Sequence, residues 1–212
     1  MKGLLVKDIR IMCSQKRFFL LVLFIAVIMN FSSNTTYVVY YLTFVCSFFA
    51  ISSISYDEAD NGYPFLFTMP VDRSIYVWEK YLFGVLLNLG SWLAGLCICF
   101  VFQAAGGNLP DFVDSIAILA LMIPAMLVFN AVIFPLLFKF GSERGRIVTL
   151  CVLGIAFVAG YVLSQKMDLL ELIRVISGYP VAVLAFFIVT VTAVLMTISC
   201  AASIVIMRKK EL

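Results

Sequence analysis

The chain has 212 residues, of which 64% are hydrophobic and only 13% are charged, whereas soluble domains average about 45–50% and about 25%. A domain of this length must cover its outside with polar groups in water, so the composition excludes a soluble globular protein and predicts a polytopic membrane protein. The formal net charge is +3 and there is no histidine, which excludes histidine-based catalytic triads, histidine zinc sites and imidazole proton relays.

The first segment, residues 1–17, combines an apolar stripe with positive charges. Leu5, Ile9 and Met12 recur at helical spacing, and four cations flank them. This pattern predicts an amphipathic helix in the headgroup region of the cytoplasmic leaflet. A plain positively charged anchor explains the charges equally well but explains the periodicity less well. The cations are Lys2, Lys7, Arg10 and Lys16.

Long uncharged runs follow, separated by short charged segments. A helix needs about 20 apolar residues to cross the hydrocarbon core. The run 18–56 is nearly twice that length, and the polar segment 30–36 divides it. The sequence therefore predicts an all-α fold in which residues 18–212 form one domain of six transmembrane helices. The expected spans are 17–33, 37–56, 81–103, 115–138, 147–164 and 180–207.

The distribution of lysine and arginine predicts the orientation. With the N-terminus inside, the cytoplasmic segments hold thirteen of these residues and the external side holds only Lys166 and Arg174. Such a bias places both termini in the cytoplasm. In the external stretch before the last span, Leu169, Leu172 and Ile173 share one helical face. This predicts a short amphipathic helix over residues 166–178 on the outer leaflet.

The predicted spans carry no Asp, Glu, Lys or Arg in their central parts. Ion-driven transporters and intramembrane enzymes usually need such groups, so both classes are disfavoured. No nucleotide-binding P-loop motif occurs either. We therefore expect no catalytic residue, no metal site and no cofactor bound by this chain, and any uphill transport would draw its energy from another subunit.

Mildly polar side chains do occur inside the predicted spans. One interpretation is interhelical hydrogen bonding and close packing, and the other is a weakly polar path for an amphipathic cargo. The sequence leaves both open. The candidate path residues are Thr43, Ser47, Asn88, Ser91 and Asn130.

The largest cytoplasmic element is the segment 56–80. It opens with acidic residues, continues with an apolar cluster and ends at Pro70, after which Asp72 can cap a helix that runs into the third span. An apolar cluster rimmed by charge outside the membrane predicts an exposed docking surface for another protein. The alternative is a hairpin that folds back onto the membrane surface. The cluster consists of Tyr63, Phe65, Leu66, Phe67 and Met69.

The segment 56–80 resembles the first cytoplasmic loop of ABC-2 type permeases, particularly the six-span peptide and phenol-soluble-modulin exporter type of Firmicutes. The shared features are an acidic pair, an aromatic segment, Met-Pro-Val followed by Arg, and a Lys at the next helix. The opening residues 1–5 with Lys7 and Asp8 are similar to the start of those chains. The resemblance assigns ATPase docking and coupling to Asp57, Glu58, Asn61, Gly62, Tyr63, Phe65, Phe67, Pro70, Arg73 and Lys80.

The resemblance implies the membrane-spanning half of an ABC exporter in a bacterial plasma membrane. Two permease chains, identical or homologous, would pair in the lipid bilayer. A separate ATPase dimer, which binds ATP and Mg, would dock on the segment 56–80 and drive the export of amphipathic peptides. The resemblance implies no nucleic-acid partner.

Two other interpretations of the chain remain open. A non-transporting interaction or immunity protein would bind its partner through the same segment. A passive channel would have an uncharged pore that gates by dewetting.

Overall fold

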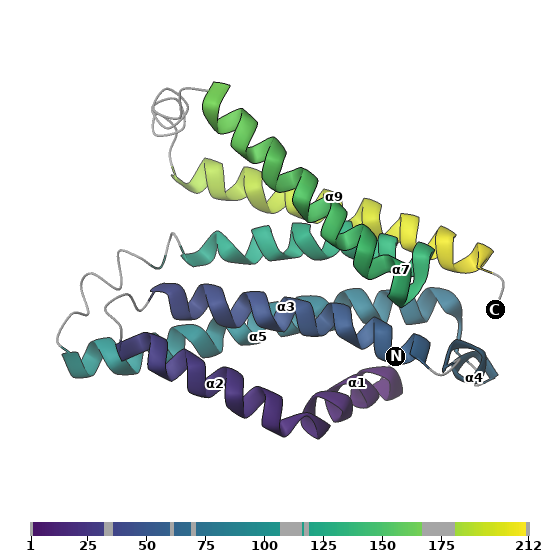
Figure 1. The fold of residues 1–212 in the computed structure, drawn as a ribbon, viewed down its shortest axis with the longest axis horizontal. Coiled ribbons are helices and arrows are strands. Elements are labelled where there is room, and N and C mark those ends of the chain that lie inside the picture. The colour runs from purple at the N-terminus through teal and green to yellow at the C-terminus, as the bar shows by residue number, and fades with distance from the viewer. Residues whose placement is uncertain are drawn as a thin grey trace.

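The computed structural model describes residues 2–31, 36–59, 62–68, 71–106, 116, 119–166 and 181–210. These residues form helices joined by short connections, and the described part contains no strand (Figure 1). The helices are α1 (Lys2–Ser14), α2 (Lys16–Phe31), α3 (Thr36–Glu58), α4 (Gly62–Thr68), α5 (Arg73–Gly106), α7 (Met122–Lys166) and α9 (Val181–Lys209). The expected external helix at 166–178 lies almost entirely outside the described residues.

The helices of the described part are long and apolar enough to cross a membrane five times, or six times if the bent pair of α1 and α2 counts as one span. The prediction of an all-α polytopic membrane protein is therefore confirmed. Helix α2 has 16 residues and is about 24 Å long at about 1.5 Å per residue. Because the hydrocarbon core is about 30 Å thick, α2 alone is a short span.

Helices α1 and α2 meet at an angle of 68°, and the bend is visible in Figure 1. The backbone N–H of Gln15 still donates to the carbonyl of Ile11, so the chain turns without losing this helical bond. The inward face of α1 differs from the expected apolar stripe. Leu4 and Asp8 are buried, whereas Ile9 is exposed.

Helix α7 contains residues 122–138 of the span expected at 115–138 and the whole of the span expected at 147–164. The break between them is at Gly141, whose φ of 79° and ψ of 177° are not helical. This backbone conformation is essentially restricted to glycine. Figure 1 shows the two limbs of α7 meeting at the end of the bundle where α9 finishes. The connection of several residues that the sequence predicted between these spans is thus replaced by a single sharp turn.

Helix α3 lies at the centre and packs against α2, α5 and α7. Gly95 of α5 allows a close approach to α3, because an added Cβ there would lie 3.0 Å from Cα of Val39. Helix α5 is joined to α9 by the hydroxyl of Tyr81, which lies 2.6 Å from Oγ of Ser199 and 2.8 Å from Oγ of Ser203. The first and last described residues and α4 lie at one end of the bundle (Figure 1), which we call the charged end.

Candidate functional site

The segment expected to be a cytoplasmic loop is largely helical. Helix α3 continues to Glu58, α4 occupies Gly62–Thr68 and α5 begins at Arg73, well before the expected span at residue 81. The backbone N–H of Tyr76 donates to the carbonyl of Asp72, which places Asp72 at the cap position that the sequence predicted. At Gly62 an added Cβ would overlap the backbone carbonyl of Asp57. Glycine therefore lets α4 begin directly against the end of α3.

Five charged side chains from three helices meet at the charged end, and we call them the charged cluster: Lys7 and Asp8 of α1, Asp57 of α3, and Glu79 and Lys80 of α5. Nζ of Lys80 lies 2.5 Å from Oδ2 of Asp8 and 2.7 Å from Oδ2 of Asp57. Lys7 forms a second ion pair with Asp57. The side chains of Lys80 and Asp8 have no exposed surface. Since an unpaired buried charge is very costly, this mutual pairing fixes α1, α3 and α5 together.

Glu79 is the member of the cluster whose pairing is incomplete. Its side chain is fully buried, and neither carboxylate oxygen has a hydrogen-bond partner among the described residues. The negative charge of Asp8 repels the Glu79 carboxylate, whereas the positive charges of Lys80 and Lys7 attract it. The cluster thus holds three carboxyl groups against two amines, and only the Lys7 side chain is substantially exposed.

Two tyrosines extend the charged cluster to α4. The hydroxyl of Tyr76, which is fully buried, donates to Oδ2 of Asp57 at 3.1 Å. The ring of Tyr63 in α4 packs edge-to-face on that of Tyr76, with centroids 5.9 Å apart. Burial raises the pKa of the Tyr63 phenol, so this hydroxyl stays neutral. Helix α4 is therefore anchored to α3 and α5 by aromatic packing over a buried ion pair.

The end of α9 is attached to the same region by Arg73. Its Nη1 donates to the backbone carbonyls of Met207, Arg208 and Lys210 at 3.2, 3.1 and 2.9 Å. These carbonyls would otherwise lack partners at a helix C-terminus, where a cation is also favoured by the helix dipole. Nζ of Lys210 lies 3.2 Å from Oε1 of Glu58. The beginning of α5 and the end of α3 thus hold the end of α9.

The expectation that the apolar cluster of this segment is exposed is wrong for Tyr63 and Leu66, which are only 3% and 9% exposed. Both belong to the main apolar core, together with Tyr76, Phe138 and Met207. The physical reason is that α4 turns one face inward, where its aromatic and aliphatic side chains exclude water from the ion pairs beneath. The outward positions of α4 are instead Pro64 and Thr68.

The structure brings most of the other predicted coupling residues into this arrangement. Asp57, Glu58, Arg73 and Lys80 all bond to neighbouring helices, so their side chains serve contacts within the chain. Asn61 and Pro70 lie outside the described residues, as do the side chains of Phe65 and Phe67.

Sequence reasoning missed Asp8 and Glu79 as members of this site. Asp8 lies one helical turn after Leu4 on the buried face of α1. A lysine at the start of an apolar helix needs a carboxylate partner if it is buried. The position of Lys80 at the start of an apolar run therefore pointed to a carboxylate partner, but the sequence could not say which carboxylate would meet it.

The five candidate path residues are all buried within the single chain. Oγ of Ser47 donates to Oδ1 of Asn88 at 2.6 Å, and Nδ2 of Asn88 donates to the carbonyl of Gly84 at 2.9 Å. Oγ of Ser91 donates to the carbonyl of Asn88, and Oγ1 of Thr43 donates to that of Val39. The side chain of Asn130 has no hydrogen-bond partner in the described part of the chain. The Ser47–Asn88 bond joins α3 to α5, the other bonds lie within one helix, and a role in a transport path stays a prediction.

Comparison with known proteins decides the class to which this bundle belongs. The family model described as "ABC-2 family transporter protein" matches residues 3–208. The chain belongs to the ABC-2 transporter family. It is a multi-pass membrane protein and a permease subunit of an ABC transporter, a family whose members work with an ABC ATPase. The recognition based on the segment 56–80 and the opening residues is thereby confirmed at the family level.

The other two comparisons add no relative. Neither the search of curated proteins nor the search of solved structures returned a match.

Proposed function

We propose that this permease exports amphipathic peptides or related amphiphiles from the cell, and that a separate ATPase dimer drives it through α4 and the flanking ends of α3 and α5. The observation that carries the proposal is the buried bonding of Lys80 to Asp8 and Asp57. Because α4 packs on this cluster and Arg73 holds the end of α9, a push on α4 moves four other helices together. The predicted coupling residues thus act mainly as a transmission element.

This role refines the docking surface expected from the sequence. The ATPase would touch the outward side of α4, where Pro64 and Thr68 are exposed, while Tyr63 and Leu66 pass the motion inward. The lysine and arginine bias supports a cytoplasmic position for the charged end, and we propose that the membrane is the plasma membrane of a bacterium. ATP and Mg would be bound by the ATPase, and a second permease chain, identical or homologous, would complete the path.

An amphipathic cargo fits the chemistry of the spans. Their central parts carry hydroxyl and amide groups but no charge, so they suit a molecule with alternating apolar and weakly polar surfaces better than an ion. A second candidate function is a non-transporting immunity or interaction protein that binds its partner through the same α4 surface. It requires neither an ATPase nor coupling between α4 and the spans.

Arg73→Glu tests the proposed coupling. The variant loses three bonds to the end of α9 and places a carboxylate near those carbonyls, so we expect peptide export in proteoliposomes with the partner ATPase to fall at least tenfold. ATP hydrolysis should persist, because the ATPase site is on another chain. Arg144→Glu is the matched control: it makes the same charge change at an exposed position of α7 and should export normally. Normal export by the Arg73→Glu variant would contradict the coupling role.

A further inference from the structure

An aromatic groove lies between the start of α2 and the half of α3 nearest the charged end. Its cavity volume is about 450 Å³, within the range of small-molecule sites. From Tyr56 to Phe44 it follows α3 for about 18 Å, at about 1.5 Å per residue. The principal lining residues are Gln15, Phe18, Phe44, Phe48, Ser52 and Tyr56.

The walls of this groove are held by ring contacts with the rest of the bundle. Phe19 of α2 packs edge-to-face on Phe49 of α3, with centroids 5.1 Å apart. Phe48 packs on Phe129 of α7 at 5.5 Å. The rings of Phe18 and Phe44 remain 44% and 46% exposed on the open side. The groove is therefore a preformed apolar channel that opens to the side of the bundle, where hydrocarbon surrounds a membrane protein.

The mouth of the groove is polar and lies at the bend between α1 and α2. Nε2 of Gln15 donates to the hydroxyl of Tyr56 at 2.6 Å, joining the two sides of the mouth. Lys16 and Arg17 follow directly and are exposed. The groove thus runs from an apolar interior to a polar mouth, and the two exposed cations come next in the chain after Gln15. An apolar stretch that ends near polar and charged groups matches the polarity of a phospholipid molecule.

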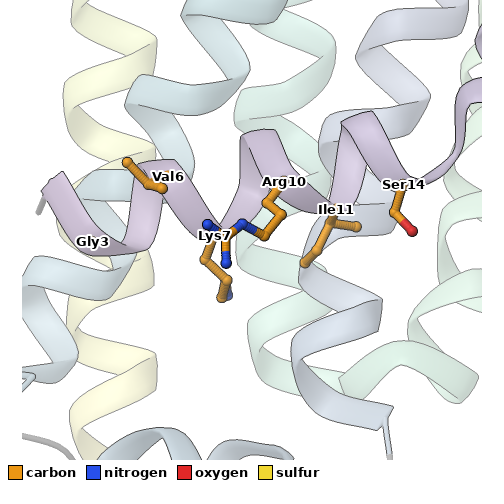
Figure 2. A pocket seen from close by; sticks show the side chains of 6 residues that line it. All are labelled: Gly3, Val6, Lys7, Arg10, Ile11 and Ser14. Carbon is orange, nitrogen blue, oxygen red and sulfur yellow. The ribbon is translucent and has the colours of Figure 1, made fainter.

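The cations at this bend differ from those of the charged cluster. Among the described residues, ion pairs involve Lys7, Lys80 and Lys210, whereas Lys16 and Arg17 have none. On the outward face of α1, a shallow cavity is lined by Lys7 and Arg10, and also by Gly3 (Figure 2). Lys7 at this cavity is already paired with Asp57, so the unpaired positive surface is that of Lys16 and Arg17. It complements an anionic ligand and would repel a cationic peptide.

We propose that the groove between α2 and α3 binds one acyl chain of an anionic phospholipid from the leaflet at the charged end, with its phosphate against Lys16 and Arg17. The lipid would fill the space between the α1–α2 pair and α3. It would thereby brace α1, which supplies Lys7 and Asp8 to the charged cluster. The proposal concerns a lipid site and does not depend on the cargo of the permease.

Native mass spectrometry of the full-length chain in detergent, incubated with phosphatidylglycerol or phosphatidylcholine, tests this site. We expect preferential retention of phosphatidylglycerol. Lys16→Gln with Arg17→Gln should weaken that retention roughly 25-fold, because each cation near an anionic headgroup contributes about fivefold. The control pair Arg144→Gln with Lys209→Gln removes two exposed cations elsewhere and should change retention less than twofold.

Ser52→Phe provides an independent test of the groove itself. It keeps the cations but places an aromatic ring in the mouth, so retention of phosphatidylglycerol should be lost while the chain stays folded, as judged by size-exclusion chromatography. Equal loss in the control pair would overturn the proposal by showing non-specific attraction. Displacement of phosphatidylglycerol by an amphipathic peptide, with no effect of the Lys16 and Arg17 changes, would also overturn it.

Discussion

Lys80→Met is expected to lower the free energy of unfolding by about 3–5 kcal/mol, the usual cost of removing one partner from a buried ion pair. Nζ of Lys80 contacts both Asp8 and Asp57 and has no exposed surface. Its removal leaves these carboxylates, and the neighbouring Glu79, with only the partly exposed Lys7 to balance them. Chemical denaturation of the detergent-solubilised chain, followed by tryptophan fluorescence, would measure the loss.

Lys139→Met is the matched control for this variant, because Lys139 is an exposed lysine of α7. Its effect should stay within about 0.5 kcal/mol. The triple variant Lys80→Met, Asp8→Asn and Asp57→Asn removes the unpaired charges together and should recover part of the lost stability, as expected for coupled residues. Equal stability of the Lys80→Met and Lys139→Met variants would show that the charged cluster does not hold α1, α3 and α5 together.

Gly141→Ala is expected to disrupt the break in α7 that joins its two limbs. At a φ of 79° and a ψ of 177° any other residue is strained, typically by about 1–3 kcal/mol. The added Cβ would also lie 2.6 Å from Oε1 of Glu58, the carboxylate that binds Lys210. Both effects act in the same direction, so the melting temperature should fall and the end of α9 should loosen.

Gly154→Ala separates this strain from the general effect of adding a methyl group. Gly154 lies in α7, where an added Cβ would meet nothing within 4 Å. Alanine favours helix by up to about 1 kcal/mol over glycine, so this variant should be as stable as the wild type or more stable. If the Gly141→Ala variant matched it in a thermal melt, the turn at Gly141 would not need glycine.

The fold class followed from the sequence because composition and the spacing of charges report directly on burial in lipid. The start of α5 after Asp72 was also predictable, since a short polar side chain before a helix is a local signal. The inward packing of α4 was not predictable. An aromatic cluster rimmed by charge has the same pattern whether it faces a partner or covers a buried ion pair, as Tyr63 and Leu66 do.

Two further features depend on contacts between distant parts of the chain. Asp8 and Lys80 meet because the chain bends by 68° between α1 and α2, which no local pattern encodes. The turn at Gly141 depends on its position against Glu58 of α3. In both cases the residue type is visible in the sequence, but its partner is set by tertiary packing.

Affinity purification of the tagged chain from native membranes tests the coupling role of α4 most directly. We predict that a soluble ATPase with a P-loop co-purifies in stoichiometric amount. Pro64→Trp, on the exposed side of α4, should abolish the association, whereas Tyr37→Trp, at the exposed start of α3, should preserve it. Recovery of the chain alone, or with only a small peptide, would contradict the proposed coupling and favour the interaction-protein interpretation.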